Sequence, residues 1–484
     1  MKKALIVAVA LVVVLAAAIV VVLLTGAEAG SETGEQGANS AAPLNNTTAE
    51  TPVEDATATP APAEFFTLDI TTLGDAEPFT VRTLWIDSLF TLTDPRGSAV
   101  FESAAGRIRG RGRTSWSNQY LREKRPLRVR FDGSSSERLR HMAGSEHAAR
   151  NWVLRSMHQD KSLMRDYSAF YLGELLPGIY WSPFAAFVHL YVNDEYMGVY
   201  MLTDERDVGP GRAQLTADPD PAVSEYMIES DWRLYRNDAI EGQDYVRVNT
   251  HPDGPREGDH SPSSARAGAL RRDYLYEIRF PDDDILTPAH FDYIRSLFTE
   301  AGLALRAGNM ADIERLVDVD SLIDFYLVQE LFQNVDAGFS SMFYQVKGQG
   351  EDRRIVLGPL WDFDVAAGNA DWLSNQTPYG LYVSTRWYWG EALHQTPQLR
   401  ERMIQRWNDY FVPATHQMLA HIHQVGTRYE AAFERNFERF PIMGVYVWPN
   451  PPHVVEIDTF MGQVDYLIDF LTRRMNYLDE YFNS

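Results

Sequence analysis

Two short stretches, Asn334-Val-Asp336 and Gly358-Pro-Leu-Trp-Asp362-Phe-Asp364, indicate the fold more clearly than any other part of the chain. Between them, residues 342–346 and 354–357 are largely apolar and flank a Gly-Gln-Gly turn, a pattern that predicts a hairpin of two short strands. Three carboxylates therefore stand at the ends of predicted elements. This layout suits a divalent metal held beside a group that is being transferred.

The order of these elements is informative in itself. An Asp in a loop, two short strands and a second Asp follow one another within 26 residues, from position 336 to position 362. Protein kinases use that order, with a catalytic-loop Asp near the acceptor hydroxyl and a later Asp on the metal. Each Asp alone also fits a helix cap or a turn. The set in this order favours phosphoryl transfer.

A second notable segment, from Arg107 to Arg130, carries nine cations and one acid. Glycines at positions 106, 110 and 112 would let backbone N–H groups approach an anion, and Arg or Lys would pair with phosphate oxygens. Lys124 is the best candidate for a lysine that binds nucleotide phosphates, and Arg125 or Arg128 could take its place. The alternative is a solvated basic face on alternating strand positions.

Composition narrows the class of protein. The chain has 484 residues, a formal net charge of −23 and no Cys. Without residues 1–63 the charge is still −19, from 42 basic and 61 acidic residues. Such an acidic body argues against nucleic-acid binding, which needs basic surface. The lack of Cys excludes disulfides, a thiolate nucleophile and a Cys-based zinc site.

The N-terminus reads as an export signal. Lys2 and Lys3 precede an apolar run over residues 4–24, which is 21 residues long and close to the ~20 needed to span a bilayer. We therefore predict that residues 1–29 are a signal anchor, with the protein on the extracellular side of the membrane. The alternative is a signal peptide cleaved near Ala29, giving a secreted protein. Residues 30–63 have the composition of a disordered linker.

From about residue 64 we predict one α+β domain, 64–484. Its first part, about 64–220, is strand-rich, with helical spacing only at 162–176. The predicted strands are 79–85, 126–131, 187–192 and 196–202. The second part, about 221–484, is helix-rich, and a capping box at Ser321 opens its first helix. The predicted helices are 321–333, 398–411, 413–436 and 457–481.

Several longer motifs accompany these residues. They are Arg109-Gly-Arg-Gly-Arg-Thr-Ser-Trp116 with Lys124-Arg-Pro; Asn151-Trp-Val-Leu-Arg-Ser-Met-His-Gln-Asp160-Lys161; Asn193-Asp-Glu-Tyr-Met-Gly-Val-Tyr-Met-Leu-Thr-Asp204; Phe325-Tyr-Leu-Val-Gln-Glu-Leu-Phe-Gln-Asn334-Val-Asp336; and Gly358-Pro-Leu-Trp-Asp-Phe-Asp364 with Gly368-Asn369. Together they resemble the spore-coat-protein-H (CotH) kinase family, and the resemblance covers most of the chain after the linker.

The resemblance implies an atypical protein-kinase-like fold of two lobes, strand-rich and then helix-rich. It also implies ATP- and Mg²⁺-dependent phosphorylation of Ser or Thr in surface or coat proteins. Asp336 would be the catalytic carboxylate. The metal would be held by Asp362, with Asp364, Ser341 and Asn369 near it. The nucleotide would contact Arg111, Arg113, Lys124, Arg128 and Asp204. Asp371 is a further supporting residue.

The chain departs from the family pattern at several positions. Arg113 stands where the family usually has Asn, Arg125 where it has a second Lys, and Asp204 where Glu is common. Ser341 stands where an ordinary kinase has the Asn that holds a second metal. Glu174 is a candidate for the glutamate of the kinase helix C.

Two other functions fit the sequence. A non-catalytic surface protein on the same fold could serve assembly or adhesion, and a glycosidase could use Glu229 and Asp231 as paired carboxylates. For the kinase we expect a protein substrate on the cell surface or coat, contact with the membrane through the N-terminal helix, and no nucleic-acid partner. The sequence does not predict an oligomeric state.

Overall fold

The computed structural model describes residues 64–74, 80–134, 139–236, 239–254, 273–371 and 375–484, which belong to one compact unit, Ala61–Ser484. The predicted signal segment 1–29 and linker 30–63 lie outside the described residues. Within the described ranges, no helix combines the length and the apolar character needed to cross a membrane.

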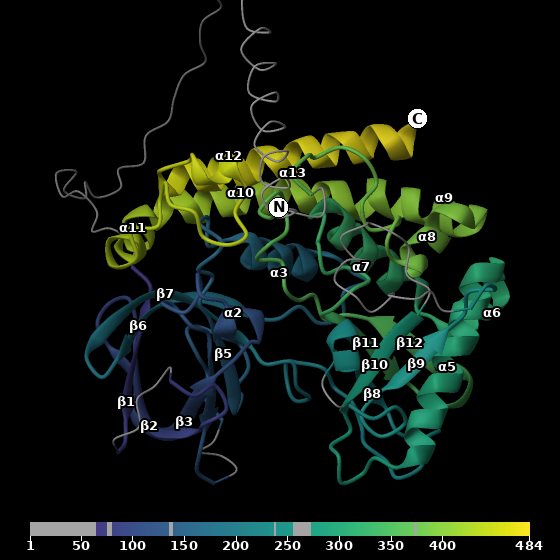
Figure 1. Ribbon diagram of the computed structural model, residues 1–484, viewed down its shortest axis with the longest axis horizontal. Helices are drawn as coiled ribbons and strands as arrows, with labels where there is room; N and C mark the ends of the chain where they lie inside the picture. Colours follow the sequence, from purple (N-terminus) through teal and green to yellow (C-terminus); the bar gives the residue numbers. More distant parts are fainter. Residues whose placement is uncertain (1–63, 75–79, 135–138, 237–238, 255–272, 372–374) are drawn as a thin grey trace, which may run out of the picture. The chain divides into compact units, whose positions relative to one another are not determined.

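The first part of this unit is a closed barrel of seven strands (Figure 1). Its order is β1-β2-β3-β4-β5-β7-β6, and the parallel pairing of β1 with β6 closes it. Alternate residues point inward, so Leu68, Phe90, Val129, Trp152 and Leu190 fill the interior. The strands are β1 (Phe66–Thr72), β2 (Ile86–Thr93), β3 (Ala99–Gly110), β4 (Leu127–Phe131), β5 (Asn151–Arg155), β6 (Ala185–Val192) and β7 (Glu195–Asp204).

The second part contains a five-stranded antiparallel sheet of order β12-β11-β8-β10-β9. Its strands are β8 (Tyr226–Ser230), β9 (Val246–Asn249), β10 (Asp273–Phe280), β11 (Met342–Lys347) and β12 (Arg354–Leu357). Helix α5 (Pro288–Ala307) packs on β9, and α7 (Val319–Leu331) packs on β12. Every residue of β8 is buried, as expected for a central strand covered on both faces.

Helices complete the unit. Helix α10 (Val412–Arg428) packs against α13 (Phe460–Asn483) and α3 (Arg165–Leu175), and α11 (Glu430–Arg439) packs against barrel strand β7, so the helices connect to the barrel. The remaining helical elements are α2 (Thr114–Ser117), η1 (Trp232–Arg236), α6 (Met310–Leu316), η2 (Gly350–Asp352), α8 (Tyr388–Gln395), α9 (Pro397–Arg406), η3 (Trp407–Phe411) and α12 (Pro452–Val455).

The predicted α+β class is confirmed, since the unit contains both sheets and helices. The predicted hairpin at 342–346 and 354–357 is present as β11 and β12. The helix-rich second part, however, also holds a whole sheet. Strand β9 alternates but has only four residues, and most of β10 is buried, so neither provides the extended alternation that the prediction relied on.

Three local predictions were wrong. The segment 80–85 is not a strand, because residues 81–84 are exposed and have no core to alternate against, and β2 begins at Ile86. Ser321 does not open its helix, since the Asp318 side chain accepts the N–H of Ser321 at 2.9 Å and caps α7 three residues earlier. The single helix expected at 413–436 is two helices, α10 and α11, which meet at Tyr429.

Candidate active site

A cavity of about 710 Å³ lies between one end of the barrel and the sheet. Its walls come from β3, β4, β5 and the residues just after β7 on one side and from β8, β10 and the loops beside β11 and β12 on the other. In a chain of net charge −23, the cavity is lined by more arginines than acids, and no lysine is among its described lining residues. Its charged residues are Arg82, Arg109, Arg111, Arg113, Arg128, Arg155, Arg206, Arg233, Arg279, Glu205, Glu229, Asp231, Asp336, Asp362 and Asp364.

Asp336 lines the cavity from the loop that follows α7. The side chain of Asn334 accepts the backbone N–H of Asp336 at 3.1 Å, and the carbonyl of Asp336 accepts the N–H groups of Phe339 and Ser340 at 2.8 and 2.9 Å. These bonds fold the loop into a tight turn. The turn holds the carboxylate of Asp336 at the cavity wall.

Asp362 and Ser341 meet across the hairpin. Ser341 precedes β11 and Asp362 follows β12, and the hydroxyl of Ser341 donates to Oδ2 of Asp362 at 2.9 Å. Both residues have left-handed backbone conformations, with φ of 55° and 63°. Such conformations cost about 1–3 kcal/mol each and persist where the surrounding structure enforces them, as is common at functional sites.

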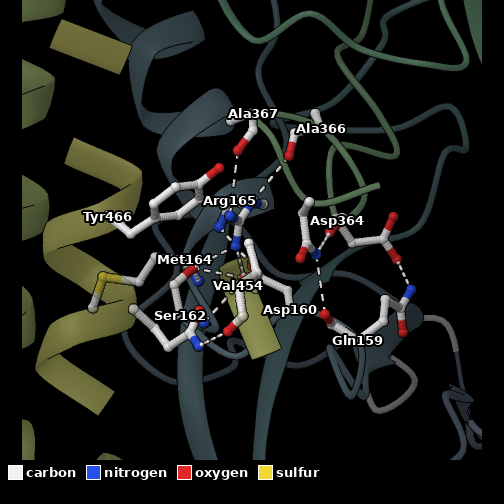
Figure 2. A network of polar contacts seen from close by, with 12 residues as sticks. Gln159, Asp160, Ser162, Met164, Arg165, Asp364, Ala366, Ala367, Val454 and Tyr466 are labelled. Carbon is white, nitrogen blue, oxygen red and sulfur yellow. Dashed lines mark hydrogen bonds and ion pairs between the residues drawn. The ribbon is translucent and has the colours of Figure 1, made fainter. Parts of the chain in front are cut away.

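Asp364 is held from the barrel side. The side-chain N–H of Gln159 donates to Oδ2 of Asp364, and both residues line the cavity (Figure 2). Asn369 lies behind them and is not part of the cavity lining. Its Nδ2 donates to the carbonyls of Gln159 at 3.0 Å and Asp364 at 2.8 Å, and its Oδ1 accepts from Asn450. Asn369 therefore positions the loops rather than facing the cavity.

A buried ion pair fixes the two loops that carry Gln159 and Asp364 (Figure 2). Arg165 pairs with Asp160 at 2.5 Å and donates to the carbonyls of Ala366 at 3.0 Å and Ala367 at 3.3 Å. Both charged side chains are almost fully buried. Because the pair links the loop after β5 to the loop after β12, it fixes the position of the barrel side of the cavity relative to the sheet side.

The carboxylates of the cavity differ in acidity. Burial, and then the charge of Asp362, raise the pKa of Asp336 to about 7, although Arg233 opposes the change. Burial also disfavours the charged form of Asp362, but Arg155 and Arg111 outweigh it and lower the pKa of Asp362 to about 2. Burial, Asp166 and Asp362 raise the pKa of Asp364. One permanently charged carboxylate beside one that titrates near neutrality is a pattern of acid–base sites.

The barrel wall supplies the predicted arginines. Arg111, Arg113 and Arg128 all line the cavity, and Arg128 pairs with Glu205 at 3.1 Å. Burial opposes the charge of Glu205, but Arg111 and Arg128 outweigh it and lower its pKa to about 2. The wall thus holds fixed charges of both signs.

Lys124 lies outside the cavity lining. It is 0% exposed, and its Nζ donates to the carbonyl of Val199 at 2.6 Å and to Oδ1 of Asn436 at 2.7 Å, between the rings of Tyr200 and Phe440. Burial lowers its pKa well below the usual value for lysine. These contacts tie β7 to α11, so the structure does not bring Lys124 to a nucleotide in this cavity.

Asp204 also lies outside the cavity. It accepts from His147 at 2.8 Å, from Arg212 at 2.7 Å and from the N–H of Phe184 at 3.0 Å, which uses both its carboxylate oxygens. The next residue, Glu205, faces the cavity instead. Asp371 and the exposed Glu174 are not among the lining residues either.

Arg155 and Arg206 line the cavity but had no role in the sequence prediction, whereas Arg111 did. The guanidinium groups of Arg111, Arg155 and Arg206 all lie over the indole of Trp361, at 5.1, 4.9 and 4.9 Å from its ring centre. We call these three the Trp361 arginines. The only sequence signal for Arg155 is its charge at the end of an apolar strand, Asn151-Trp-Val-Leu-Arg155, and the prediction did not use it.

The oxygen groups of the cavity fit a hard divalent cation that keeps water or substrate ligands. Asp362 and Asp364 supply carboxylates, Ser341 supplies a hydroxyl, and the buried Oε1 of Gln159 has no hydrogen-bond partner among the described residues. No group of three or more His, Asp or Glu side chains arranged for a metal occurs in the described part of the chain. Mg²⁺ is commonly bound through one or two carboxylates together with substrate phosphates.

Comparison with known families agrees with the resemblance noted in the sequence. The family model described as CotH kinase protein matches residues 107–478, which is most of the chain and includes every lining residue except Arg82. No curated protein matches the chain.

Proposed function

The chain belongs to the CotH kinase family, and from this premise we propose that it transfers the terminal phosphate of ATP to a Ser or Thr hydroxyl of a protein. The observation that carries the proposal is the pairing of Asp336 and Asp362 in one arginine-lined cavity. Asp362 stays charged, while the pKa of Asp336 is raised to about 7. Family membership supports a kinase type of enzyme, and the cavity supports the assignment of residues.

Asp336 is proposed as the catalytic base. A base works best when its pKa lies near the working pH, because it is then ionised and still accepts a proton. The acceptor oxygen attacks the terminal phosphorus, the bond from that phosphorus to the oxygen of ADP breaks, and the hydroxyl proton passes to the carboxylate of Asp336. Charge, proton and phosphoryl group are then all accounted for.

Asp362 and Asp364 are the proposed ligands of Mg²⁺, with the hydroxyl of Ser341 supporting Asp362. When bound, the cation would neutralise charge on the phosphate oxygens. Ser341 and Arg155 orient Asp362 from opposite sides, at 2.9 Å each. The carboxylate is therefore held in position before any ligand arrives, which reduces the reorganisation needed for catalysis.

The arginines of the cavity are proposed to hold the polyphosphate. Guanidinium groups pair with phosphate oxygens through two parallel N–H groups, and they remain charged when buried. Arg111, Arg113 and Arg128 take this role in place of Lys124. The excess of arginine over acid in the cavity favours a polyanionic ligand in a protein that is otherwise strongly acidic.

We also propose that the barrel and the following part act as the two lobes of an atypical kinase, about 64–220 and 221–484, with the nucleotide between them. Export by residues 1–29 would place this domain outside the cell, anchored by residues 4–24 or released near Ala29. Its acceptor would then be a surface or coat protein.

The two other functions remain as outcomes of the test. A scaffold protein has no need for a carboxylate whose pKa is raised to about 7. For a glycosidase, Glu229 and Asp231 do line the cavity, but Glu229 pairs with Arg206 and Arg279, and Asp231 pairs with Arg233. Carboxylates engaged by arginine suit fixed charges better than the proton donor that glycoside cleavage requires.

Labelled ATP tests the proposal. The full-length protein would be incubated with Mg²⁺, ATP labelled at the terminal phosphate, and a generic basic protein as acceptor. We expect label on the protein or the acceptor, only background label with Asp362→Asn, and transfer at least about 100-fold slower with Asp336→Asn. Label that persists in both variants would contradict the site. If the wild-type protein neither transfers label nor is stabilised against melting by Mg²⁺ and ATP, the kinase proposal is wrong and a surface scaffold is the better account.

A further inference from the structure

Arg155 stands between the candidate metal ligands and a second buried acid. Its Nη2 lies 2.7 Å from Oδ2 of Asp166, 2.9 Å from Oδ1 of Asp362 and 4.0 Å from Oδ2 of Asp364. It reaches this place from the end of β5, with its guanidinium over the indole of Trp361. One cation therefore serves three carboxylates.

Asp166 is a fixed partner for Arg155. It lies in the first turn of α3 and is 1% exposed, and its Oδ1 accepts the backbone N–H of Phe363 at 2.8 Å. Phe363 stands between Asp362 and Asp364 in the chain. Asp166 thus anchors both the guanidinium of Arg155 and the backbone that carries the two candidate ligands.

Arg155 has bonding capacity left over. It lines the cavity, the residue is only 5% exposed, and its Nη1 has no hydrogen-bond partner among the described residues. A buried N–H group without an acceptor is destabilising, because it has given up its hydrogen bonds to water. An acceptor supplied by a ligand would remove that cost. The neighbouring Arg111 and Arg206, stacked on the same indole, add positive charge that favours an anion.

Arg155 also competes with a metal ion. Its Nη2 contacts Oδ1 of Asp362, one of the candidate metal ligands, and two positive charges beside one carboxylate would repel each other. A cation that binds Asp362 must therefore weaken the contact with Arg155. The guanidinium is then left with Asp166 on one side and the cavity on the other.

We propose that Arg155 exchanges partners when a metal–nucleotide complex binds. It is the counter-ion of Asp362 in the free protein, and it pairs with a phosphate oxygen once a divalent cation takes Asp362, with Asp166 holding it throughout. This inference rests on the proposed function and adds Arg155 to Arg111, Arg113 and Arg128 as a residue that contacts phosphate. Arginine suits the exchange because its planar fork can contact a carboxylate and a phosphate at once.

The exchange predicts opposite effects on the metal and on the nucleotide. We would titrate the full-length protein at pH 8 with Mn²⁺ alone, following the spin resonance signal of free Mn²⁺. A second titration would use a non-hydrolysable ATP analogue with Mn²⁺ at saturation, followed by calorimetry. Arg155→Met should bind Mn²⁺ alone about tenfold more tightly and the nucleotide about tenfold more weakly, the low end of what one neighbouring charge does to an ionic equilibrium.

Two further variants sharpen this test. Asp166→Asn keeps the shape of the side chain but leaves Arg155 with only Asp362 and Asp364 as charged partners, so Mn²⁺ and nucleotide should both bind more weakly. Arg279→Met is a matched control, because it removes the same charge from the cavity wall. The Arg279 side chain contacts Glu277 and Glu229 at 2.6 and 3.5 Å rather than Asp362. This variant should change the Mn²⁺ affinity by less than about twofold.

Failure of this inference can be told apart from failure of the proposed kinase function. If the wild-type protein transfers phosphate while Arg155→Met changes both affinities in the same direction, or neither, Arg155 is structural and only the inference fails. If the wild-type protein binds neither Mn²⁺ nor nucleotide, both fail. If circular dichroism shows that Arg155→Met does not fold, Arg155→Lys is the deciding variant. It should lower the affinity for the nucleotide more than the affinity for Mn²⁺, and equal changes in the two affinities would overturn the inference.

Discussion

Lys124 and Arg155 are both buried cations of the barrel region, and their surroundings differ in kind. Lys124 is enclosed by neutral groups, the carbonyl of Val199 and the amide oxygen of Asn436, and its environment lowers its pKa. Arg155 is surrounded by carboxylates, lines the cavity and keeps a donor without a partner among the described residues. The first arrangement is saturated, whereas the second leaves a place for a ligand.

Loss of Lys124 should affect the stability of the protein, whereas loss of Arg155 should affect ligand binding. The contacts of Lys124 join β7 to α11, so its loss should weaken the packing of the helices on the barrel. Arg155 neutralises neighbouring carboxylates that would otherwise repel one another in the free protein. The region around Arg155 should therefore matter more for ligand binding. The predictions below test this division, beginning with the largest expected effect.

The largest effect should come from Asp362→Asn. The variant loses the charge that a divalent cation needs, so Mg²⁺-dependent transfer from ATP should fall to background. Its melting temperature should stay within a few degrees of wild type, because the amide still fits between Ser341 and Arg155. The exposed Asp352→Asn in the same hairpin is the control and should behave as wild type. If Asp362→Asn instead lost much of its stability and still transferred phosphate, Asp362 would serve stability rather than catalysis.

Asp336→Asn should remove the base and lower the rate of transfer by about 10²- to 10⁴-fold. In the wild-type protein the rate should rise with pH toward a plateau above about pH 7, because only the ionised form of Asp336 accepts the proton. A bound cation would move this limb to lower pH. The rate profile from pH 5 to 9 checks this, and a limb of the same position in the variant would argue against Asp336.

The same variant should be more stable than wild type at alkaline pH. The folded protein keeps the proton of Asp336 up to about pH 7, whereas an unfolded Asp loses it near 3.8, so the folded state binds more protons between these values. Stability contributed by this group therefore falls as pH rises through that window. Melting temperatures at pH 4 and pH 8 should show a gain for Asp336→Asn mainly at pH 8. An equal gain at both would indicate another cause.

Lys124→Met should act on stability alone. It removes the donor to the carbonyl of Val199 and one of the two donors to Oδ1 of Asn436, which still accepts the backbone N–H of Val199, at a cost of about 1–3 kcal/mol in the free energy of unfolding. Denaturant unfolding measures this loss, and Lys347→Met, at the end of β11, is the control with a smaller effect. Nucleotide affinity of the folded fraction should not change. A lysine that bound phosphate would show the reverse.

Ser341→Ala should give the smallest effect. It removes the hydroxyl that donates to Oδ2 of Asp362, a bond worth about 1 kcal/mol, so Mn²⁺ affinity should fall by roughly fivefold. The Mn²⁺ titration described above measures this change. A loss as large as that of Asp362→Asn would mean that Ser341 ligates the metal directly.

The sequence predicted the part of the site that is local in the chain. Asp336, Ser341, Asp362 and Asp364 line one cavity because a single loop and hairpin carry them all, and this hairpin could be read from turn residues and apolar runs. The α+β class followed from the same patterns. The roles proposed for these residues rest on the experiments above.

The rest depended on contacts that periodicity does not encode. Arg155 comes to the hairpin only because β5 pairs with β7 in a closed barrel. Lys124 lies next to the Gly- and Arg-rich segment in sequence, yet the closed packing of β7 and α11 seals it from the cavity. Asp204 and Glu205 are neighbours with opposite orientations, so a register error of one residue exchanges a buried anchor for a cavity-lining acid.

The most direct test of the central claim is the position of the metal. Crystals grown with Mn²⁺ and a non-hydrolysable ATP analogue would be measured at the manganese absorption edge. We predict an anomalous peak within coordination distance of Asp362 and phosphates that lie between this peak and Arg155. Lys124 should still donate its hydrogen bond to Asn436. A peak elsewhere, or phosphates in contact with Lys124, would contradict the central claim.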